Sequence, residues 1–283
     1  MSMPVDTPYI IGVIRSQEQG LLQSDEFTRL IEAPSNSEAI RVLVDTPYGA
    51  WLTTNTADEA FTALTKRLVH LQAWLVDTLV DIDVLHFLQL RYDALNVATA
   101  LIEFQAGSAE PTQLSGLGAI NPLLVQSVVF NQLGHDELSE QWETFIRSEQ
   151  EQLPGEDADV AQWKNGLLAR SETFVVEQMR ESATTPFMKW YVDFTERRLM
   201  DDRAKRNGEE LTADFTTERE WDNELVNKLR EFAGDPIGYD PVVAHWLTVE
   251  LEARTIRLVL AAKLQGSKPE DIRPLVRNLV SEH

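Results

Sequence analysis

The stretch VELEARTIRLVLAAKLQG at residues 249–266 decides the fold, because its apolar residues recur at helical spacing on two sides. At 100° per residue they form one stripe along a helix and a second stripe nearly opposite the first. The first stripe contains Val249, Ala253, Ile256, Leu260 and Leu264, and the second contains Leu247, Leu251, Leu258 and Ala262. A helix on the outside of a globular protein shows a single apolar stripe. Two opposed stripes therefore predict a helix that packs against other helices on both sides.

A similar helix occurs twice more in the chain. LQLRYDALNVATALIEFQAG at 88–107 aligns without a gap on LTVELEARTIRLVLAAKLQG at 247–266, and a weaker copy, YVDFTERRLMDDRAKRNG, occupies 191–208. Both strong copies share an acidic residue and a final glycine, which is a common helix C-cap. The corresponding residues are Asp93 with Glu252 and Gly107 with Gly266, and the weak copy has Asp193 and Gly208 in these places. Three copies at comparable intervals predict a repeated helical unit of roughly a hundred residues.

Helical spacing also dominates the rest of the sequence, and sustained alternation of apolar and polar residues is hard to find. The longest amphipathic pattern runs from Phe61 to Ile82, and Thr56 with Glu59 three residues later marks its start as a capping box. Two further pairs of this kind, Ser35 with Glu38 and Ser267 with Glu270, predict two more helix starts. The sequence therefore predicts an all-α protein.

The composition is strongly acidic, with 46 Asp and Glu against 25 Lys and Arg and a net charge of -21. A charge of this sign repels DNA and anionic membrane surfaces, so we expect no nucleic-acid partner. The chain has no cysteine, which excludes disulfides, thiolate chemistry and zinc sites that depend on cysteine.

The N-terminus and the apolar segments indicate a cytoplasmic protein. MSMPVDTPYIIGVIRSQEQG at residues 1–20 lacks the basic flank of a signal peptide or a transit peptide. No apolar segment is long enough to cross a bilayer, because Asp77, Asp81 and Asp83 interrupt the longest one. We therefore expect no direct membrane span.

Motifs for catalysis are weak throughout the chain. SGLGAIN at 115–121 lacks the lysine of a phosphate-binding loop and is typical of a turn. Asp83 and His86 offer two metal ligands at helical spacing, but a di-metal bundle needs this element twice and two further glutamates. In MDDRAKRNGEE at 200–210, Lys205 stands where helical terpenoid synthases need another carboxylate. The sequence predicts no catalytic residue, no metal site and no cofactor, although a helical metal enzyme stays an alternative.

One segment, HDELSEQWETFIRSEQEQLPGEDADV at 135–160, is much more acidic than the rest, with nine Asp or Glu and one Arg. It is typical of a solvated helix face followed by a loop. The functional interpretation is a docking surface for a basic partner protein. The candidate residues for that surface are Glu149, Glu151, Glu156, Asp157 and Asp159.

Three segments together resemble one protein family. The first is YIIGVIRSQEQGLLQSDEFTRLIEAPSNSEAIRVLVDTPYGAWL at 9–52, the second is the helix at 92–107, and the third is DPIGYDPVVAHWLTVELEARTIRLVLAAKLQGSKPEDIRPLV at 235–276. The matching residues are Tyr9, Arg15, Leu21, Leu22, Phe27, Leu30, Leu43, Tyr48, Gly49, Asp93, Asn96, Gly107, Pro236, Gly238, Glu252, Arg257, Lys263, Gly266, Ile272 and Arg273. They resemble the central-stalk subunit of rotary ATPases, called C in V/A-type bacterial and archaeal enzymes and d in the eukaryotic vacuolar proton pump. His245 departs from the family, which commonly has a tyrosine there.

This resemblance implies a funnel of three related helical units, of which the third is abbreviated in this chain. We expect the units at residues 1–108, 109–208 and 209–283. The family-motif residues with an expected structural role are Tyr48, Gly49, Asp93, Asn96, Gly107, Glu252, Arg257 and Gly266.

The resemblance also implies a function, that of a non-catalytic socket that links the rotor shaft to the membrane c-ring for ion transport. The implied partners are the shaft subunits of the D and F type and the c-ring. One copy of the chain would lie peripherally on the cytoplasmic face of the membrane in a hetero-complex. The alternative is a stand-alone helical adaptor derived from this family.

Overall fold

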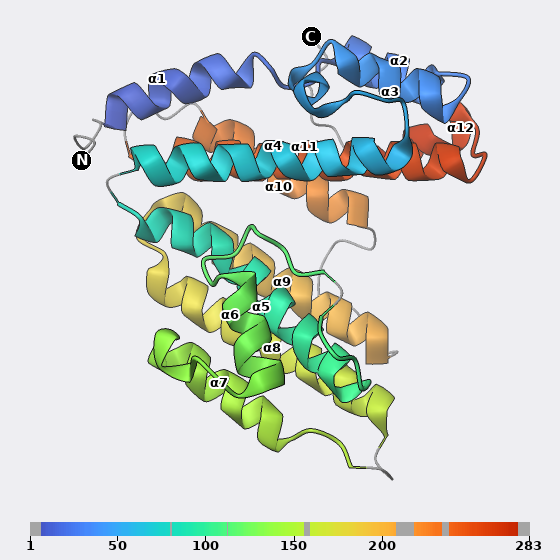
Figure 1. Cartoon of the computed structure of the whole chain (residues 1–283). Coiled ribbons are helices and arrows are strands. Elements are labelled where there is room, and N and C mark those ends of the chain that lie inside the picture. Colours follow the sequence, from blue (N-terminus) through green and yellow to red (C-terminus); the bar gives the residue numbers. More distant parts are fainter. Residues whose placement is uncertain are drawn as a thin grey trace. The chain divides into compact units, whose positions relative to one another are not determined.

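A computed structural model describes residues 7–79, 81–111, 113–155, 159–207, 218–233 and 238–276. Within these ranges the chain forms α-helices and short 3-10 helices and no strand, which confirms the predicted all-α class (Figure 1). The α-helices are α1 (Thr7–Glu18), α2 (Ser24–Glu32), α3 (Asn36–Val44), α4 (Ala57–Thr78), α5 (Asp83–Gln105), α6 (Pro122–Asn131), α7 (Glu140–Glu151), α8 (Val160–Ser182), α9 (Pro186–Asn207), α10 (Glu218–Ala233), α11 (Asp240–Leu264) and α12 (Pro269–Ile272). The 3-10 helices are η1 (Pro47–Trp51), η2 (His135–Glu137) and η3 (Arg273–Leu275).

The chain divides into two compact units. The first unit contains the described residues of 1–80, 185–187 and 213–283, and the second contains those of 81–184 and 188–212. The predicted division into three related units at 1–108, 109–208 and 209–283 stays a prediction.

Helix α11 is the central helix of the first unit. It packs against α10, α4, α1 and α3. Both predicted stripes are used, because Val249 and Ile256 of the first stripe and Leu247 and Leu251 of the second are all buried. At the C-terminal end of the helix, Leu264 is exposed. The prediction of packing on both sides is therefore confirmed for most of the helix.

A single hydrophobic core joins the N-terminal helices to α11. Leu30 from α2 and Leu43 from α3 contribute to it, together with Leu64 from α4 and Leu260 from α11. All four side chains are fully buried. Burial of a leucine side chain contributes about 1.5–3 kcal/mol, so this core holds segments from opposite ends of the sequence in one unit.

Helix starts follow the predicted caps in two of three places. The Thr56 side chain accepts a hydrogen bond from the Glu59 N–H at the start of α4, and Ser35 does the same for Glu38 at α3. The prediction for Ser267 is wrong by one residue, because α12 begins after Lys268 and has no side-chain cap.

The long amphipathic pattern 61–82 does not form one helix. Helix α4 ends at Thr78, since Leu79 adopts an extended backbone with φ -69° and ψ 132°. The next helix, α5, starts at Asp83, whose N–H donates to the Asp81 side chain. A helical pattern in sequence therefore continues across a break in the helix.

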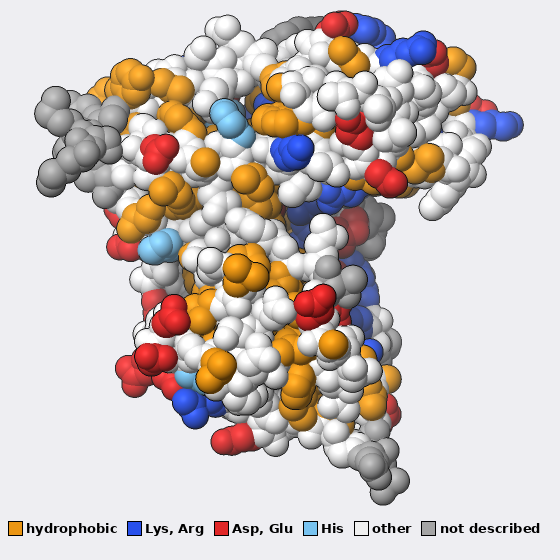
Figure 2. Space-filling view, in the orientation of Figure 1, with side chains coloured by type: hydrophobic (Ala, Val, Ile, Leu, Met, Phe, Trp, Pro, Cys, Tyr) orange, Lys and Arg blue, Asp and Glu red, His pale blue; other side chains and the backbone are white. Residues whose placement is uncertain are grey.

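In the second unit, α5 packs against α8, α6 and α7. Aromatic side chains fill the space between α7 and α8, where the rings of Phe145 and Phe174 stack with centroids 4.5 Å apart. Trp142 meets Phe174 edge-on at 4.7 Å. Figure 2 shows several acidic side chains at the edge of the second unit near the start of α7, with a basic side chain close by.

No helix among the described residues is both long and apolar enough to cross a membrane.

Candidate functional site

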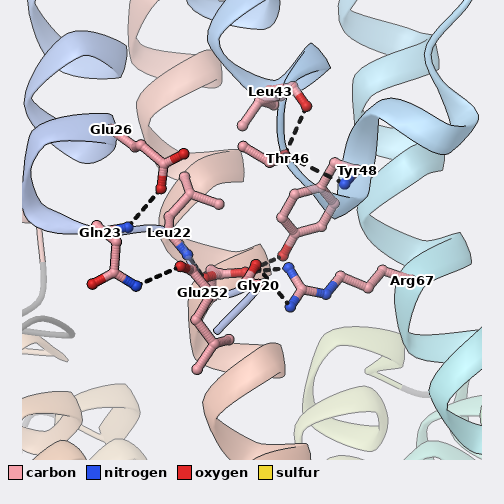
Figure 3. Close-up of polar contacts among 10 residues, drawn as sticks. Gly20, Leu22, Gln23, Glu26, Leu43, Thr46, Tyr48, Arg67 and Glu252 are labelled. Carbon is pink, nitrogen blue, oxygen red and sulfur yellow. Dashed lines mark hydrogen bonds and ion pairs between the residues drawn. The ribbon is translucent and has the colours of Figure 1, made fainter. Parts of the chain in front are cut away.

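The most developed polar site of the first unit is a buried cluster around Glu252 (Figure 3). The Glu252 carboxylate accepts three hydrogen bonds, from the Arg67 guanidinium at 2.6 Å, the Tyr48 hydroxyl at 2.8 Å and the Leu22 N–H at 2.6 Å. Glu252 is 2 % exposed and Tyr48 is fully buried. Because buried charges are costly unless they are paired and hydrogen-bonded, these contacts are what allow the carboxylate to lie inside the unit.

Each member of the cluster comes from a different element. Glu252 lies on α11, Arg67 on α4, Tyr48 on η1, and Leu22 in the connection between α1 and α2. The guanidinium of Arg67 also lies over the Tyr48 ring, 4.7 Å from its centroid. The cluster therefore ties the N-terminal elements to the last long helix of the chain.

Local geometry places Tyr48. The Thr46 hydroxyl donates to the Leu43 carbonyl at 2.7 Å and accepts from the Tyr48 N–H at 3.3 Å, so it caps the start of η1. Gly49 follows, and a Cβ at this position would lie 1.9 Å from the carbonyl oxygen of Val44. Only glycine permits this close approach between η1 and the end of α3.

Burial is the main cause of the pKa shifts in and around the cluster. It raises the pKa of Glu252, while the Arg67 charge and the hydrogen bonds oppose that shift. Burial, with the Glu252 charge, also raises the pKa of Tyr48 well above its usual value, so its hydroxyl keeps its proton as a donor. His245, on the same helix, is 3 % exposed, and burial with the nearby Arg67 charge lowers its pKa to about 4. His245 is therefore neutral at physiological pH.

The second unit contains a similar arrangement around Asp93 on α5. Its carboxylate accepts from the backbone N–H groups of Ala119 at 3.1 Å and Ile120 at 2.9 Å. Asn96, one turn later, exchanges two hydrogen bonds with the backbone of Ser115, at 2.7 and 2.8 Å. Burial raises the pKa of Asp93 to about 6, although both N–H groups oppose the shift.

Gly118 is required by this arrangement. A Cβ at Gly118 would lie 2.1 Å from one Asp93 carboxylate oxygen. The segment SGLGAIN, whose composition indicates a turn, is thus the loop that Asp93 and Asn96 hold against α5.

The two strong copies of the repeated helix agree in detail. Asp93 and Glu252 occupy the same register, and each buried carboxylate accepts a backbone N–H from a distant loop. Both helices end at a glycine with positive φ, 79° at Gly107 and 78° at Gly266, followed by the same pair of capping hydrogen bonds. In the weaker copy Asp193 is exposed, and Gly208 lies outside the described residues. The buried carboxylate is therefore a shared feature of the two strong copies.

The remaining C-terminal motif residues lie around the end of α11. Lys263 donates to the carbonyls of Ile31 at 2.7 Å and Ala33 at 2.6 Å, so it caps the end of α2, where a cation is favoured. Arg273 pairs with Glu32 of the same helix. Arg257 is exposed and lies over the Phe61 ring at 5.9 Å, outside the Glu252 cluster. Pro236 lies outside the described part of the chain.

The acidic docking candidates occupy different environments. Glu149 is 1 % exposed and forms a bidentate ion pair with Arg170, both contacts being 2.7 Å, so its carboxylate faces the interior of the unit and not an open acidic surface. Glu151 is exposed at the end of α7. Asp159 is exposed and caps α8 by accepting from Ala161 and Gln162. Glu156 and Asp157 lie outside the described residues, and a docking role for these acids stays a prediction.

Arg67 was not predicted from the sequence, yet it carries the only positive charge hydrogen-bonded to Glu252 among the described residues. A signal for it was present, because Arg67 falls three residues after Leu64 and four before Leu71, on the apolar stripe of α4. A charged residue on the buried face of a helix predicts a buried partner of opposite charge.

Chemically, both clusters hold backbone segments in place and keep their polar atoms hydrogen-bonded. Within the described ranges, no group of three or more His, Asp or Glu side chains is placed to hold a metal ion. Asp83 and His86 lie 3.9 Å apart on the surface of α5. The fold and the sites define an all-helical protein in which buried carboxylates hold distant segments together.

Residues 10–144, a little less than half of the chain, match the family described as ATP synthase (C/AC39) subunit. A comparison with curated proteins gives no match. The matched region includes Leu22, Tyr48 and Arg67 of the first cluster and Asp93 and Asn96 of the second. Over these residues the chain is similar to this family, in agreement with the resemblance found in its sequence.

Proposed function

We propose that this chain is the non-catalytic central-stalk socket of a V/A-type ATPase, which links the rotor shaft to the membrane c-ring for ion transport. The family match over residues 10–144 carries the proposal. Three residues of that region, Leu22, Tyr48 and Arg67, are bonded directly to Glu252 on α11. Helix α11, which lies beyond the match, is therefore part of the same unit as the N-terminal part of the matched segment.

A part that transmits torque must resist deformation, and the contacts in the first unit favour this role. The Glu252 cluster fixes four elements at one point, and Lys263 with Arg273 fixes the end of α2 to the C-terminal region. Buried, fully hydrogen-bonded polar networks restrict a structure to one arrangement because every alternative leaves a charge unpaired. Stiffness of this kind serves a part that passes rotation from one neighbour to another.

The charge of the chain favours a basic partner. Its net charge is -21, and α7 with the preceding η2 exposes acidic side chains at Asp136, Glu137 and Glu140. Together with Glu151 and Asp159, these residues form the surface that we propose for docking a basic protein of the rotor shaft. Since complementary charge speeds and orients association more than it adds affinity, this docking depends on salt.

Affinity purification tests the proposal. The tagged full chain, expressed at its natural level, is captured from membranes in mild detergent and its co-purifying proteins are identified. We expect shaft proteins of the D and F type, the c-ring and the catalytic head. Capture of the chain alone, or with proteins unrelated to a rotary ATPase, would contradict the proposal and favour a stand-alone helical adaptor.

A further inference from the structure

The second unit contains a pocket beside the Asp93 cluster. It lies where α5, α6, η2, α7 and α8 meet the loop before α6, and its volume is about 340 Å³. This is at the small end of the range for ligand pockets, so it suits one side chain or a small molecule. Asp93, which holds the loop, is also part of its wall.

The lining combines apolar walls with negative charge. Leu90, Leu124 and Trp142 contribute apolar surface, and Asp93 and Glu137 contribute carboxylates. Asp93 is 1 % exposed and its carboxylate already accepts two backbone N–H groups, whereas Glu137 is exposed, so Glu137 is the more accessible of the two acids. None of the residues that line the pocket is Lys or Arg, and the only other titratable one is His86.

We propose that this pocket binds the side chain of an arginine from a basic partner protein. A guanidinium donates hydrogen bonds in several directions, so one group can reach two carboxylates. Its flat face is weakly hydrated and stacks on aromatic rings, and Trp142 is one of the residues that line the pocket. The apolar walls suit the aliphatic part of the same side chain. The proposal rests on the proposed function for the partner's identity, which is then the basic protein of the rotor shaft.

The state of Asp93 supports a cationic occupant. Its partners are two backbone N–H groups, and burial still raises its pKa to about 6. At neutral pH it therefore carries a negative charge that neither Lys nor Arg from the lining neutralises. A guanidinium in the pocket supplies the missing charge.

The test uses N-acetyl-arginine amide as the probe and N-acetyl-citrulline amide as the matched control, since citrulline has the same shape without the charge. The full chain is labelled with 5-fluorotryptophan, and the Trp142 fluorine resonance is assigned with Trp142→Phe. We expect a saturable shift of that resonance with the arginine probe and none with citrulline. No saturable shift, or an equal shift with both probes, would overturn the proposal.

Two variants of exposed carboxylates separate the pocket from general charge effects. Glu137→Gln removes the exposed carboxylate of the pocket and should weaken probe binding about two- to fivefold, as for a partly exposed charge pair. Glu177→Gln removes an exposed carboxylate of α8 that does not line the pocket, and it should leave binding unchanged. Equal effects of the two variants would contradict the proposal.

Two measurements together distinguish the pocket proposal from the proposed function. They are capture of the shaft proteins and binding of the arginine probe. If the wild-type chain captures them and does not bind the arginine probe, the pocket proposal fails and the proposed function stands. If the probe binds but no shaft protein is captured, the pocket stands as an arginine site and the proposed function fails.

Discussion

Glu252 shows how one buried residue can hold a large part of a protein. Its two oxygens accept hydrogen bonds from a guanidinium, a phenol and a backbone N–H, so each oxygen of the carboxylate has a partner. A buried ion pair adds little net stability compared with apolar residues of the same size, but breaking it by removing one partner is expensive. The contribution of this cluster is therefore the arrangement that it enforces.

The buried pair of Arg67 and Glu252 gives a first prediction. Arg67→Met should lower the free energy of unfolding by about 3–5 kcal/mol, because it leaves a carboxylate buried without a cation. Adding Glu252→Gln should recover about 1–3 kcal/mol, since glutamine keeps the shape and an acceptor but carries no charge. Urea unfolding of both variants measures the difference.

The matched control is the exposed pair of Arg41 and Glu38, which lies on α3. Arg41→Met should cost less than about 1 kcal/mol. If Arg67→Met is equally mild, or if Glu252→Gln worsens it, the Glu252 cluster does not hold the unit as argued.

Asp93 gives a second prediction, which concerns pH. Its pKa is about 6 in the folded state against an ordinary value of 3.8, so the folded state binds more protons between these values. The contribution of Asp93 to the free energy of unfolding is fully present below pH 3.8 and is lost as pH rises through 6. Asp93→Asn should reduce the fall in unfolding free energy between pH 4 and pH 7 by about 2–3 kcal/mol.

Chemical unfolding across that pH range measures this difference. Asp193→Asn is the control, because its carboxylate is the exposed counterpart on α9. An unchanged pH profile for Asp93→Asn would show that the Asp93 carboxylate is not destabilised by burial.

His245 gives a third prediction, of opposite sign. Burial lowers its pKa from 6.5 to about 4, so the unfolded state binds more protons in this window. The contribution of His245 to stability is then fully present above pH 6.5 and is lost as pH falls toward 4. His245→Phe should flatten the acid side of the stability profile, measured by thermal unfolding between about pH 4 and 7. The exposed His70→Gln is the control, and equal acid sensitivity of wild type and His245→Phe would contradict the prediction.

At the scale of elements, α5 and α11 have two features in common. They share a buried carboxylate in the same register and the same glycine C-cap. The caps matter because the glycine that closes each helix adopts a left-handed backbone that a side chain disfavours.

A fourth prediction follows for these glycines. Gly107→Ala and Gly266→Ala should each lower the melting temperature and cost about 1 kcal/mol, because φ is positive at both positions. Space is not the cause, since a Cβ at either position meets no atom within 4 Å. Gly12→Ala, inside α1 and equally unobstructed, should instead raise stability. The same loss at Gly12 would exclude the backbone explanation.

Helix faces and helix ends could be predicted from the sequence, because both depend on residues that are close together in the chain. The two stripes of α11, its C-terminal glycine and the caps at Thr56 and Ser35 all depend on residues a few positions apart. The break after Thr78 was missed because apolar spacing continues through it. The spacing of apolar residues indicates which face of a helix is buried, but it does not indicate whether the helix is continuous.

The partners of Glu252 could not be predicted from spacing. Leu22, Arg67 and Tyr48 lie 230, 185 and 204 positions away in sequence. No local pattern relates residues at such separations, and only folding brings them together. The correspondence of Asp93 with Glu252 was visible in the alignment, but the N–H groups that each binds were not.

At the scale of the whole molecule, each compact unit contains one of these carboxylate helices. The family match begins in the first unit and continues into the second, through Asp93 and Asn96. The resemblance found in the sequence is thus confirmed in part of both units. The three-unit funnel and the docking role of the acidic surface stay predictions. The first concerns how parts of this chain are arranged, and the second concerns partner proteins.

We propose that this chain couples rotation of the shaft to ion transport. The most direct measurement uses inverted membrane vesicles from cells that lack the chain and compares ATP hydrolysis with ATP-driven ion uptake. We expect hydrolysis by the catalytic head to continue while ion uptake is lost, and uptake to return when the chain is restored. Normal ATP-driven uptake without the chain would contradict the claim.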